Sequence, residues 1–220
     1  MDRAALASHL LTNVQVQQQL EREHLPTGIH SFDSLTGGLP RGAITEIYGP
    51  ASCGKTTFLH ALLANSSVKG EFCALVDASD SFDPASAAAA GTEFARLLWV
   101  RCTGAEQAIR SADLLVHSGG WGVVVLDLGD VRAEMMRKVP LSYWYRFKRA
   151  VENTATLFLV LAREPHAKNC AAMSLELPPG KPIWSGAHRD FQLLRGMEVH
   201  VAPRKPMRSA RAAFQAKALA

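Results

Sequence analysis

One segment of eight residues limits the possible folds of this chain more than any other. Residues 49–56 read Gly-Pro-Ala-Ser-Cys-Gly-Lys-Thr, which fits the pattern G-x-x-x-x-G-K-[ST]. A strand-like run, Ile44–Tyr48, leads into the segment, and a helix-like run that begins at Lys55 leads out of it. The glycines let the backbone turn its N–H groups toward a phosphate, and the helix adds the positive end of its dipole. The sequence therefore predicts a phosphate-binding loop between a strand and a helix.

The loop and a later strand together predict a nucleotide site with a metal ion. The Lys55 ammonium is expected to reach the β- and γ-phosphates, and the Thr56 hydroxyl to ligate Mg²⁺. A second apolar run, Val123–Leu126, ends in Asp127, where a fold of this kind holds its Mg²⁺-side carboxylate. Leu128 follows, so no glutamate stands directly after that aspartate. The predicted nucleotide-binding residues of the loop are Gly49, Pro50, Ala51, Ser52, Cys53, Gly54, Lys55, Thr56 and Thr57, and the predicted metal ligands are Thr56 and Asp127.

Strand and helix patterns alternate along the middle of the chain. Strands are predicted at Ala43–Tyr48, Phe72–Val76, Leu97–Arg101, Gly122–Leu126 and Thr156–Leu161. Helices are predicted at Lys55–Ala64, from Pro84 to Gly91 with Asp83 as N-cap, from Thr103 to about His117, and over Arg132–Asn153 with a break at Pro140. This alternation predicts an α/β fold in which helices flank a mostly parallel central sheet.

The two ends of the chain have a different character. After Glu164, short strand-like runs joined by turns predict an antiparallel extension at one sheet edge; they are Met173–Leu177, Phe191–Leu194 and Glu198–Val201. Residues 1–24 have the pattern of a polar amphipathic helix, which Pro26 ends. Three parts are therefore predicted: an N-terminal helix over residues 1–24, a nucleotide-binding core over 25–202 and a basic tail over 203–220.

The positive charge is concentrated in two places. The formal net charge is +4, and residues 201–220 contain five basic residues and no acidic one. A basic, alanine-rich tail suits an anionic partner such as nucleic acid, and a solvated end explains it equally well. A second basic block, residues 131–150, contains Tyr143, Trp144, Tyr145 and Phe147. Basic and aromatic residues together can bind single-stranded DNA, but an amphipathic helix that buries its rings on the sheet is the favoured interpretation.

Composition excludes several classes of protein. Hydrophobic residues make up 48% and charged residues 20%, which excludes a wholly disordered chain. No run approaches the ~18 apolar residues of a membrane span, and the polar N-terminus is unlike a secretory signal. Four irregularly spaced cysteines predict reduced thiols in a cytoplasmic protein. Cys53, inside the loop, allows either a redox switch or, as the favoured interpretation, a small residue at a variable position.

Several stretches resemble the RecA family. They are Leu25–Ile29, Phe32–Leu35, Gly37–Gly42 and Ile44–Pro50, which run into the phosphate loop, followed by Val76–Ala78 and Asp83-Pro84. The resemblance covers about residues 25–162. It implies a RecA-like P-loop NTPase core that binds ATP with Mg²⁺, and a role in DNA recombination or repair.

The chain also departs from the pattern of that family at three positions. RecA recombinases carry a water-activating glutamate two residues after the aspartate that matches Asp77; here the residue is Ser79. Its neighbour Asp80 is the candidate that could replace it as the catalytic carboxylate. The adenine-stacking tyrosine of the family falls near Ser86, and its γ-phosphate-sensing glutamine is Arg163, which is a candidate to contact the nucleotide.

These departures, in a small chain, resemble the ImuA family of RecA-like proteins. The carboxyl-terminal run Phe191–Val199 is similar to the L-L-R-G ending of that family, and Trp184-Ser185 before it also fits. The resemblance implies an accessory protein of inducible translesion DNA synthesis, active in the cytoplasm or at the nucleoid. Its implied partners are RecA and an ImuB-like polymerase, and its ATP hydrolysis is expected to be weak or absent.

Two other functions are weighed against this one. The first is a working, DNA-stimulated ATPase of the RecA superfamily, either a recombinase paralogue or a KaiC-like signalling ATPase. The second is an interaction protein with a vestigial nucleotide site. A stripe formed by Leu6, Leu10 and Val14 in the predicted N-terminal helix is expected to dock on another RecA-like surface in a homo- or hetero-oligomer, or equally on its own core.

Overall fold

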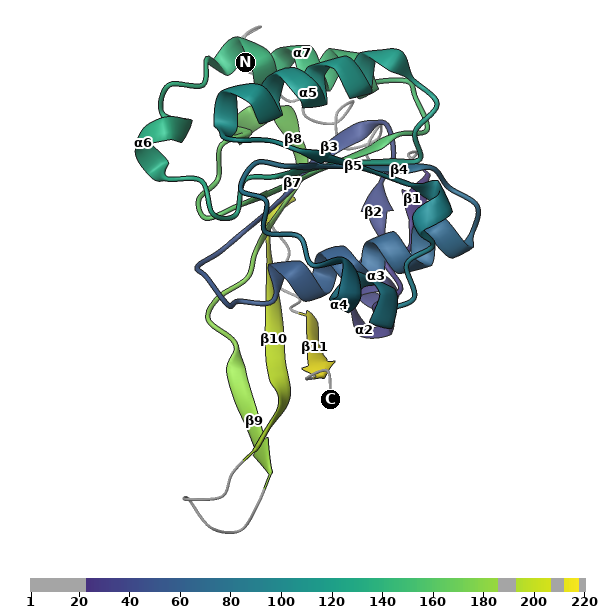
Figure 1. Ribbon diagram of the computed structural model, residues 1–220, viewed down its shortest axis with the longest axis vertical. Helices are drawn as coiled ribbons and strands as arrows, with labels where there is room; N and C mark the ends of the chain where they lie inside the picture. The colour runs from purple at the N-terminus through teal and green to yellow at the C-terminus, as the bar shows by residue number, and fades with distance from the viewer. Residues whose placement is uncertain (1–22, 186–192, 207–211, 218–220) are drawn as a thin grey trace, which may run out of the picture.

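The protein is built on one mixed sheet with helices on both faces (Figure 1). The computed structural model describes residues 23–185, 193–206 and 212–217. Within these ranges the sheet strands are β3 (Ala43–Tyr48), β4 (Cys73–Asp77), β5 (Leu97–Arg101), β6 (Val123–Asp127), β7 (Leu157–Ala162), β8 (Ala171–Glu176), β9 (Lys181–Ser185), β10 (Leu193–Lys205) and β11 (Ala212–Lys217). The helices are α2 (His30–Thr36), α3 (Lys55–Val68), α4 (Pro84–Ala89), α5 (Ala105–Ser118), α6 (Ala133–Met136) and α7 (Leu141–Val151). Two short strands, β1 (His24–Leu25) and β2 (Leu39–Pro40), pair with each other.

The strand order confirms the predicted α/β architecture. The described strands join as β11-β10-β8-β3-β7-β6-β4-β5, and β9 pairs with β10. All neighbours between β8 and β5 are parallel, whereas β10 is antiparallel to β8, β9 and β11. The carboxyl ends of the parallel strands therefore meet along one edge of the sheet, which is where ligands bind in folds of this kind.

Helices cover the sheet on two sides and bury its central strands completely. Helices α5 and α7 lie on one face, and α2, α3 and α4 lie on the other (Figure 1). Val123–Leu126 and Leu157–Ala162 are buried along their whole length, as their continuous apolar sequence predicts. None of the helices in the described ranges is both long and apolar enough to span a bilayer.

Helix α7 accounts for most of the basic and aromatic block. Pro140 precedes the helix and separates it from α6, as predicted. Trp144 and Phe147 are buried, and the Phe147 ring lies 5.0 Å from the ring of Phe158 on β7. Tyr145 remains 57% exposed. The interpretation as an amphipathic helix that buries its rings is therefore confirmed for Trp144 and Phe147, which are not accessible for stacking on nucleic-acid bases, but not for Tyr145.

The carboxyl-terminal strands differ from the prediction in three respects. Strand β8 is parallel to β3 and belongs to the main sheet, so the antiparallel extension begins later than expected. The runs Phe191–Leu194 and Glu198–Val201 are not two strands joined by a turn; β10 continues through Arg195-Gly196. Strand β9 was not predicted. The reason is that orientation and strand length here depend on pairing between distant segments, which local pattern does not encode.

The predictions for the two ends of the chain are tested only in part. The predicted N-terminal helix lies outside the described residues except at its end, where His24 begins β1 instead. The boundary placed at residue 203 falls inside β10. In the described parts of the predicted tail, residues 203–205 are the end of β10 and Ala212–Lys217 form strand β11, which pairs with β10; these residues are therefore paired strands and not a solvated end. The Ser31 hydroxyl donates to the Ala213 carbonyl (2.8 Å), so this strand also contacts α2.

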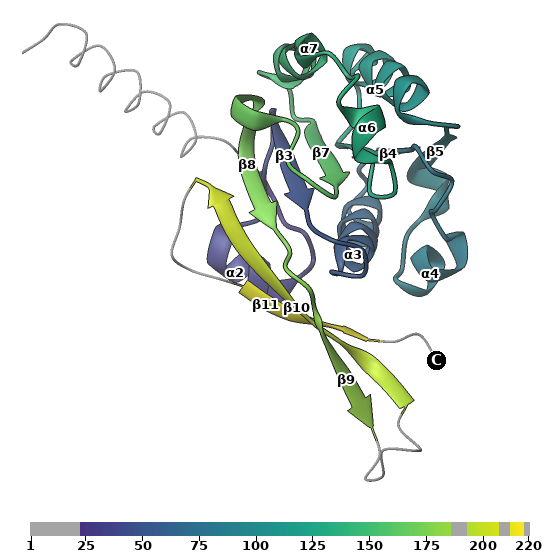
Figure 2. The ribbon, with the colours of Figure 1, turned by 90° about the vertical axis from the view of Figure 1, so that its left-hand side faces the viewer.

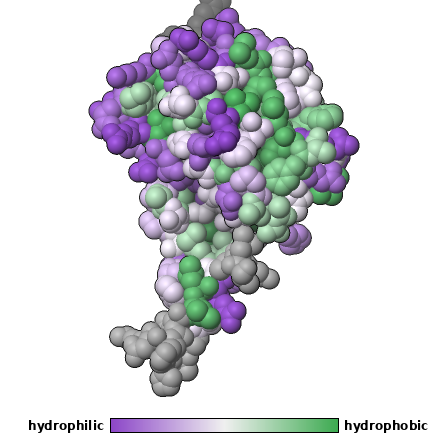
Figure 3. Space-filling view, viewed as in Figure 1, coloured by the Kyte–Doolittle hydropathy of each residue, from purple (hydrophilic) through white to green (hydrophobic). Residues whose placement is uncertain are grey.

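Strands β9 and the first part of β10 form a hairpin that projects from the body of the protein (Figure 2). Leu194 pairs with Trp184 across this hairpin. Trp184, Leu193 and Leu194 are the exposed large apolar residues of its described part, where Figure 3 shows hydrophobic side chains next to hydrophilic ones.

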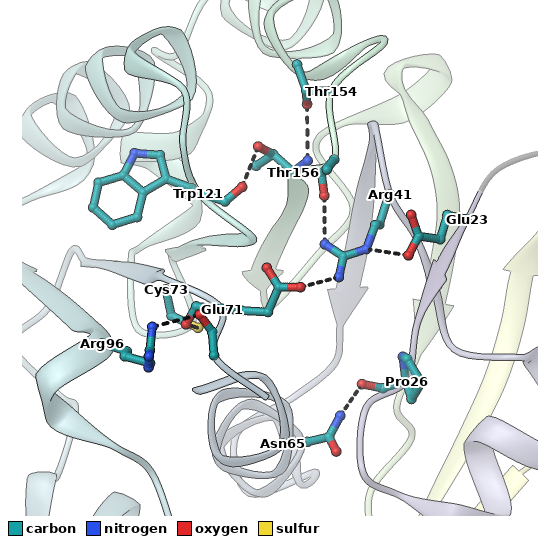
Figure 4. A network of polar contacts seen from close by, with 12 residues as sticks. Glu23, Pro26, Arg41, Asn65, Glu71, Cys73, Arg96, Trp121, Thr154 and Thr156 are labelled. Carbon is teal, nitrogen blue, oxygen red and sulfur yellow. Dashed lines mark hydrogen bonds and ion pairs between the residues drawn. The ribbon is translucent and has the colours of Figure 1, made fainter. Parts of the chain in front are cut away.

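Near the amino ends of the parallel strands, the buried Arg41 connects four segments of the chain (Figure 4). Arg41 is only 9% exposed, and its guanidinium donates to the Glu71 carboxylate (2.6 Å) and to the Ala155 carbonyl (2.8 Å). The Glu23 carboxylate lies 3.6 Å from its Nε. A buried charge is tolerated only with such partners, so this contact fixes the loops that precede β3, β4 and β7.

Candidate functional site

The phosphate loop connects β3 to α3 in a conformation that requires its glycines. Gly54 has φ +101°, a region that favours glycine. A Cβ on Gly54 would lie 2.6 Å from a methyl group of Val199, and a Cβ on Gly49 would lie 2.2 Å from the Leu177 carbonyl oxygen. The loop is therefore packed against both the end of β8 and strand β10. The Leu177 N–H in turn donates to the Tyr48 carbonyl (2.8 Å).

Lys55 and the start of α3 supply the positive charge of the site. The Lys55 ammonium donates to the carbonyls of Gly49 (2.7 Å) and Pro50 (2.8 Å). The Phe58 N–H donates to the Gly54 carbonyl (3.0 Å) and closes the first turn of the helix. The preceding N–H groups, from Lys55 to Thr57, therefore have no partner within the helix and can bind an anion.

Two aspartates stand side by side at the ends of β4 and β6. Asp77 and Asp127 are paired in register in the parallel sheet. Asp77 is buried, and its carboxylate accepts hydrogen bonds from the N–H groups of Ser79 (3.1 Å) and Phe82 (2.9 Å), so it shapes the loop after β4. Asp127 accepts from the Gly129 N–H (2.8 Å). Burial, with the charge of Asp77 as a smaller cause, raises the pKa of Asp127 to about 6.

The loop, the helix start and Asp127 surround one cavity of about 410 Å³. Its volume lies within the range of small-molecule sites. The residues that line it are Ala51, Ser52, Cys53, Gly54, Lys55, Thr56, Thr57, Ser81, Asp127, Gly129, Asp130, Leu161 and Met197. Seven of the nine predicted loop residues and both predicted metal ligands are among them; Gly49 and Pro50 contribute through their carbonyls to Lys55 instead.

The donor set of this cavity fits a magnesium–nucleotide complex. Mg²⁺ is commonly held by one or two carboxylates or hydroxyls together with the phosphates of the substrate. Thr56 and Asp127 would supply that hydroxyl and carboxylate, and Lys55 and the helix N–H groups would supply hydrogen-bond donors to the phosphates. In the described ranges, no three His, Cys, Asp or Glu residues cluster in a way that could hold a metal ion.

Two predicted site residues lie elsewhere, because distant partners hold them. Asp80 is not among the residues that line the cavity; its carboxylate forms a bidentate ion pair with Arg101 (2.5–2.6 Å), which lowers the pKa of Asp80. Ser81 takes its place in the cavity wall. Arg163 donates to the Gly129 carbonyl (3.0 Å) and lies 3.3 Å from Asp130. It lines a neighbouring cavity with residues 131–134, so it contacts the loop after β6 rather than the phosphate cavity.

Three further residues singled out in the sequence lie in different places. The Ser86 hydroxyl donates to Asp83, the N-cap of α4, and Ser86 does not line the cavity. Ser79 is exposed and does not line it either. Cys53 is buried, with its Sγ 3.5 Å from the Lys55 nitrogen.

Sequence reasoning missed several residues of the cavity wall. Gly129 and Asp130 lie two and three residues after Asp127, so their proximity to a strand end was a usable signal. Ser81 and Leu161 also lie at strand ends or just beyond. Met197 comes from the middle of β10 and had no signal in the sequence, because an apolar residue in a strand predicts only burial.

Comparison of the sequence with those of known proteins identifies a family. The sequence model of the RecA N-terminal domain matches residues 7–137. The chain is 43% identical over 113 residues to Protein RecA of Mesorhizobium japonicum, and 44% identical over 110 residues to Protein RecA of Brucella anthropi. A further relative, Protein RecA of Deinococcus radiodurans, is 42% identical over 113 residues. The aligned stretches cover 49–50% of this chain but only 30–31% of those relatives.

Proposed function

Because this chain belongs to the RecA N-terminal domain family, we propose that it is an ATP-binding accessory protein of DNA repair that hydrolyses ATP weakly or not at all. In this proposal, the phosphate loop binds Mg²⁺–ATP through the cavity beside α3. Lys55 and the helix N–H groups hold the phosphates, and Thr56 with Asp127 holds the metal ion. Bound Mg²⁺ would neutralise charge on the phosphates.

The position of Asp80 is the observation that carries the second half of this proposal. Efficient hydrolysis needs a group that orients the attacking water. Ser79, at the position of the family's glutamate, has no carboxylate, and the carboxylate of Asp80 is paired with Arg101 outside the cavity. The site therefore retains the groups that bind phosphate and metal, while the expected water-activating groups do not reach it.

We further propose a role of the ImuA type, in SOS-type translesion DNA synthesis in the cytoplasm or at the nucleoid. RecA and an ImuB-like polymerase are the partners in this proposal, and the chain would act alone or in an oligomer with a RecA-like surface. The resemblance of its carboxyl-terminal run to the ImuA ending supports it. Single-stranded DNA is a proposed further partner, bound by charge. The exposed basic residues of the block 131–150 favour it; they are Arg132, Arg137, Lys138, Arg146, Lys148 and Arg149.

One pair of measurements tests this proposal. Mg²⁺–ATP binding and turnover are measured together, with and without single-stranded DNA, on the intact chain. Lys55→Ala is the blank, and Lys69→Ala, at the exposed far end of the same helix, is the matched control. We expect ATP binding that Lys55→Ala abolishes and Lys69→Ala leaves unchanged, with no DNA-stimulated turnover. Turnover that rises with DNA and disappears in Lys55→Ala would contradict it.

A second candidate function is a DNA-stimulated ATPase, and Asp130 is the observation that favours it. This carboxylate lines the phosphate cavity, although it lies beside Arg163. If turnover is found, Asp130→Asn should remove it while ATP binding persists. If Asp80→Asn removes it instead, the loop after β4 must rearrange when the nucleotide binds.

A further inference from the structure

Strand β10 reaches the phosphate cavity from a part of the chain that lies 140 residues beyond the loop. Met197 is the β10 residue in the cavity wall. Val199, two residues later on the same strand, is fully buried, and its methyl groups lie against Gly54. Side chains two residues apart point to the same face of a strand, so Met197 and Val199 face the phosphate loop together.

The position of Met197 is fixed by its neighbours. Met197 pairs with Ala216 of β11 on one side and with Pro182 of β9 on the other. Its side chain lies across Gly180, where an added Cβ would stand 2.5 Å from the Met197 Sδ. The thioether is therefore held between the turn before β9 and the cavity.

Val199 is the centre of a packed contact between β10 and the start of α3. Val199 pairs with Phe214 of β11, whose ring lies 6.4 Å from that of Phe58 in the first turns of α3. The Phe58 N–H binds the Gly54 carbonyl. Gly54 is thus held from one side by Val199 and from the other by its own helix, in a backbone conformation that few other residues adopt.

We propose that β10 is part of the nucleotide site: Met197 contacts the bound ligand, and Val199 is a positioning residue that holds Gly54 and so fixes the shape of the phosphate loop. This inference rests on the proposed binding of Mg²⁺–ATP. It assigns one wall of the site to the antiparallel carboxyl-terminal strands. It also explains why Gly54 in the phosphate loop and Gly180 before β9 each lie very close to a β10 side chain.

Opposite charges at position 197 test the contact. Met197 is half-buried, so both Met197→Lys and Met197→Glu can fold. A cation at this wall should tighten ATP binding and an anion should weaken it, each by about fivefold at low salt, because a unit charge near the phosphates contributes about 1 kcal/mol in water. Both effects should shrink at high salt. Thermal unfolding of the two variants without nucleotide serves as the control for folding.

The positioning role of Val199 has a matched control on the same strand. Val199→Ala and Val201→Ala remove the same atoms from two fully buried residues, but only Val199 contacts Gly54. We expect Val199→Ala to weaken ATP binding roughly three- to tenfold, because a loosened supporting contact misplaces the loop. Val201→Ala should leave binding within about twofold, since it should lower stability similarly without touching the loop.

The outcomes separate this inference from the proposed function. If the wild-type chain binds no nucleotide, the proposed function fails before position 197 is tested. If the wild type binds and Lys55→Ala does not, but Met197→Lys and Met197→Glu change affinity in the same direction or not at all, the contact at Met197 is wrong. Equal affinities for Val199→Ala and Val201→Ala would exclude the positioning role.

Discussion

Asp127→Asn should make the nucleotide-free protein more stable while it weakens metal binding. Burial raises the pKa of the Asp127 carboxyl from its ordinary value of 3.8 to about 6. The folded state therefore disfavours the ionised form. Each unit of pKa difference corresponds to 1.36 kcal/mol, so the charge costs about 3 kcal/mol at neutral pH. Asparagine has nearly the same shape, and its amide oxygen can still accept the hydrogen bond from the Gly129 N–H.

The sign of this effect depends on pH in a way that can be measured. A raised folded-state pKa means that the wild-type protein loses stability as the pH rises from about 4 to about 6 and is level above that. The Asn variant has no such loss. Its advantage should therefore be small near pH 4 and should reach about 3 kcal/mol at pH 7.5, which for a chain of this length raises the Tm by roughly 6–12 °C.

Urea denaturation at pH 4.5 and pH 7.5, in chelator and without nucleotide, measures the difference. Asp130→Asn is the control, because its side chain is 55% exposed and its contact with Arg163 is an exposed ion pair, worth less than about 1 kcal/mol. Mg²⁺–ATP affinity of the Asp127 variant, measured in parallel, should fall by at least about tenfold, since a neutral amide is a weaker ligand for Mg²⁺. A variant that is less stable than wild type at pH 7.5, or equally stabilised at both pH values, would refute the reasoning.

Two further predictions concern the framework that supports the site. Arg41→Ala should lower the free energy of unfolding by about 3 kcal/mol, because it removes a buried ion pair with Glu71, whereas Arg110→Ala, in an exposed pair, should change it by less than about 0.5 kcal/mol. Urea denaturation of both variants measures this, and equal effects would contradict it. Phe147→Ala should cost about 3–5 kcal/mol because its ring is fully buried, and the exposed Tyr145→Ala should cost little. The same assay measures both, and a Tyr145 variant as unstable as the Phe147 variant would show that α7 packs differently.

Most of the parallel core could be predicted from the sequence because its signals are local. Five apolar runs of strand length gave five strands within a residue or two of their observed ends, and the capping pair Asp83-Pro84 gave the start of α4. Strands buried on both faces need no partner to be recognised, since their sequence is apolar throughout. The antiparallel extension at this sheet edge was predicted and is present, but the parallel direction of β8 and the bounds of β9 to β11 did not follow the prediction, because direction and length depend on which distant strand pairs with them.

The residues of the candidate site show the same difference between local signals and distant contacts. Lys55, Thr56 and Asp127 could be predicted, because a loop motif and a strand end fix their positions relative to the backbone. The predicted role of Asp80 did not anticipate Arg101, which lies on a neighbouring strand 21 residues later. Arg163 is held in the same way by the loop after β6. Sequence spacing can place a charged residue near a site, but only the folded structure shows which opposite charge or carbonyl it meets first.

The ion pairs of Asp80 with Arg101 and of Asp130 with Arg163 both affect which carboxylates are available in the cavity. Asp80 is held by Arg101 outside it, and Asp130, inside it, lies beside Arg163. Asp127 is the lining carboxylate without an ion pair to an arginine, and it is the one predicted to hold Mg²⁺. This arrangement is consistent with the proposed function, in which the site would bind Mg²⁺–ATP and hydrolyse it weakly or not at all. The packing of Val199 on Gly54 connects the phosphate loop to β10, whose first part belongs to the projecting hairpin.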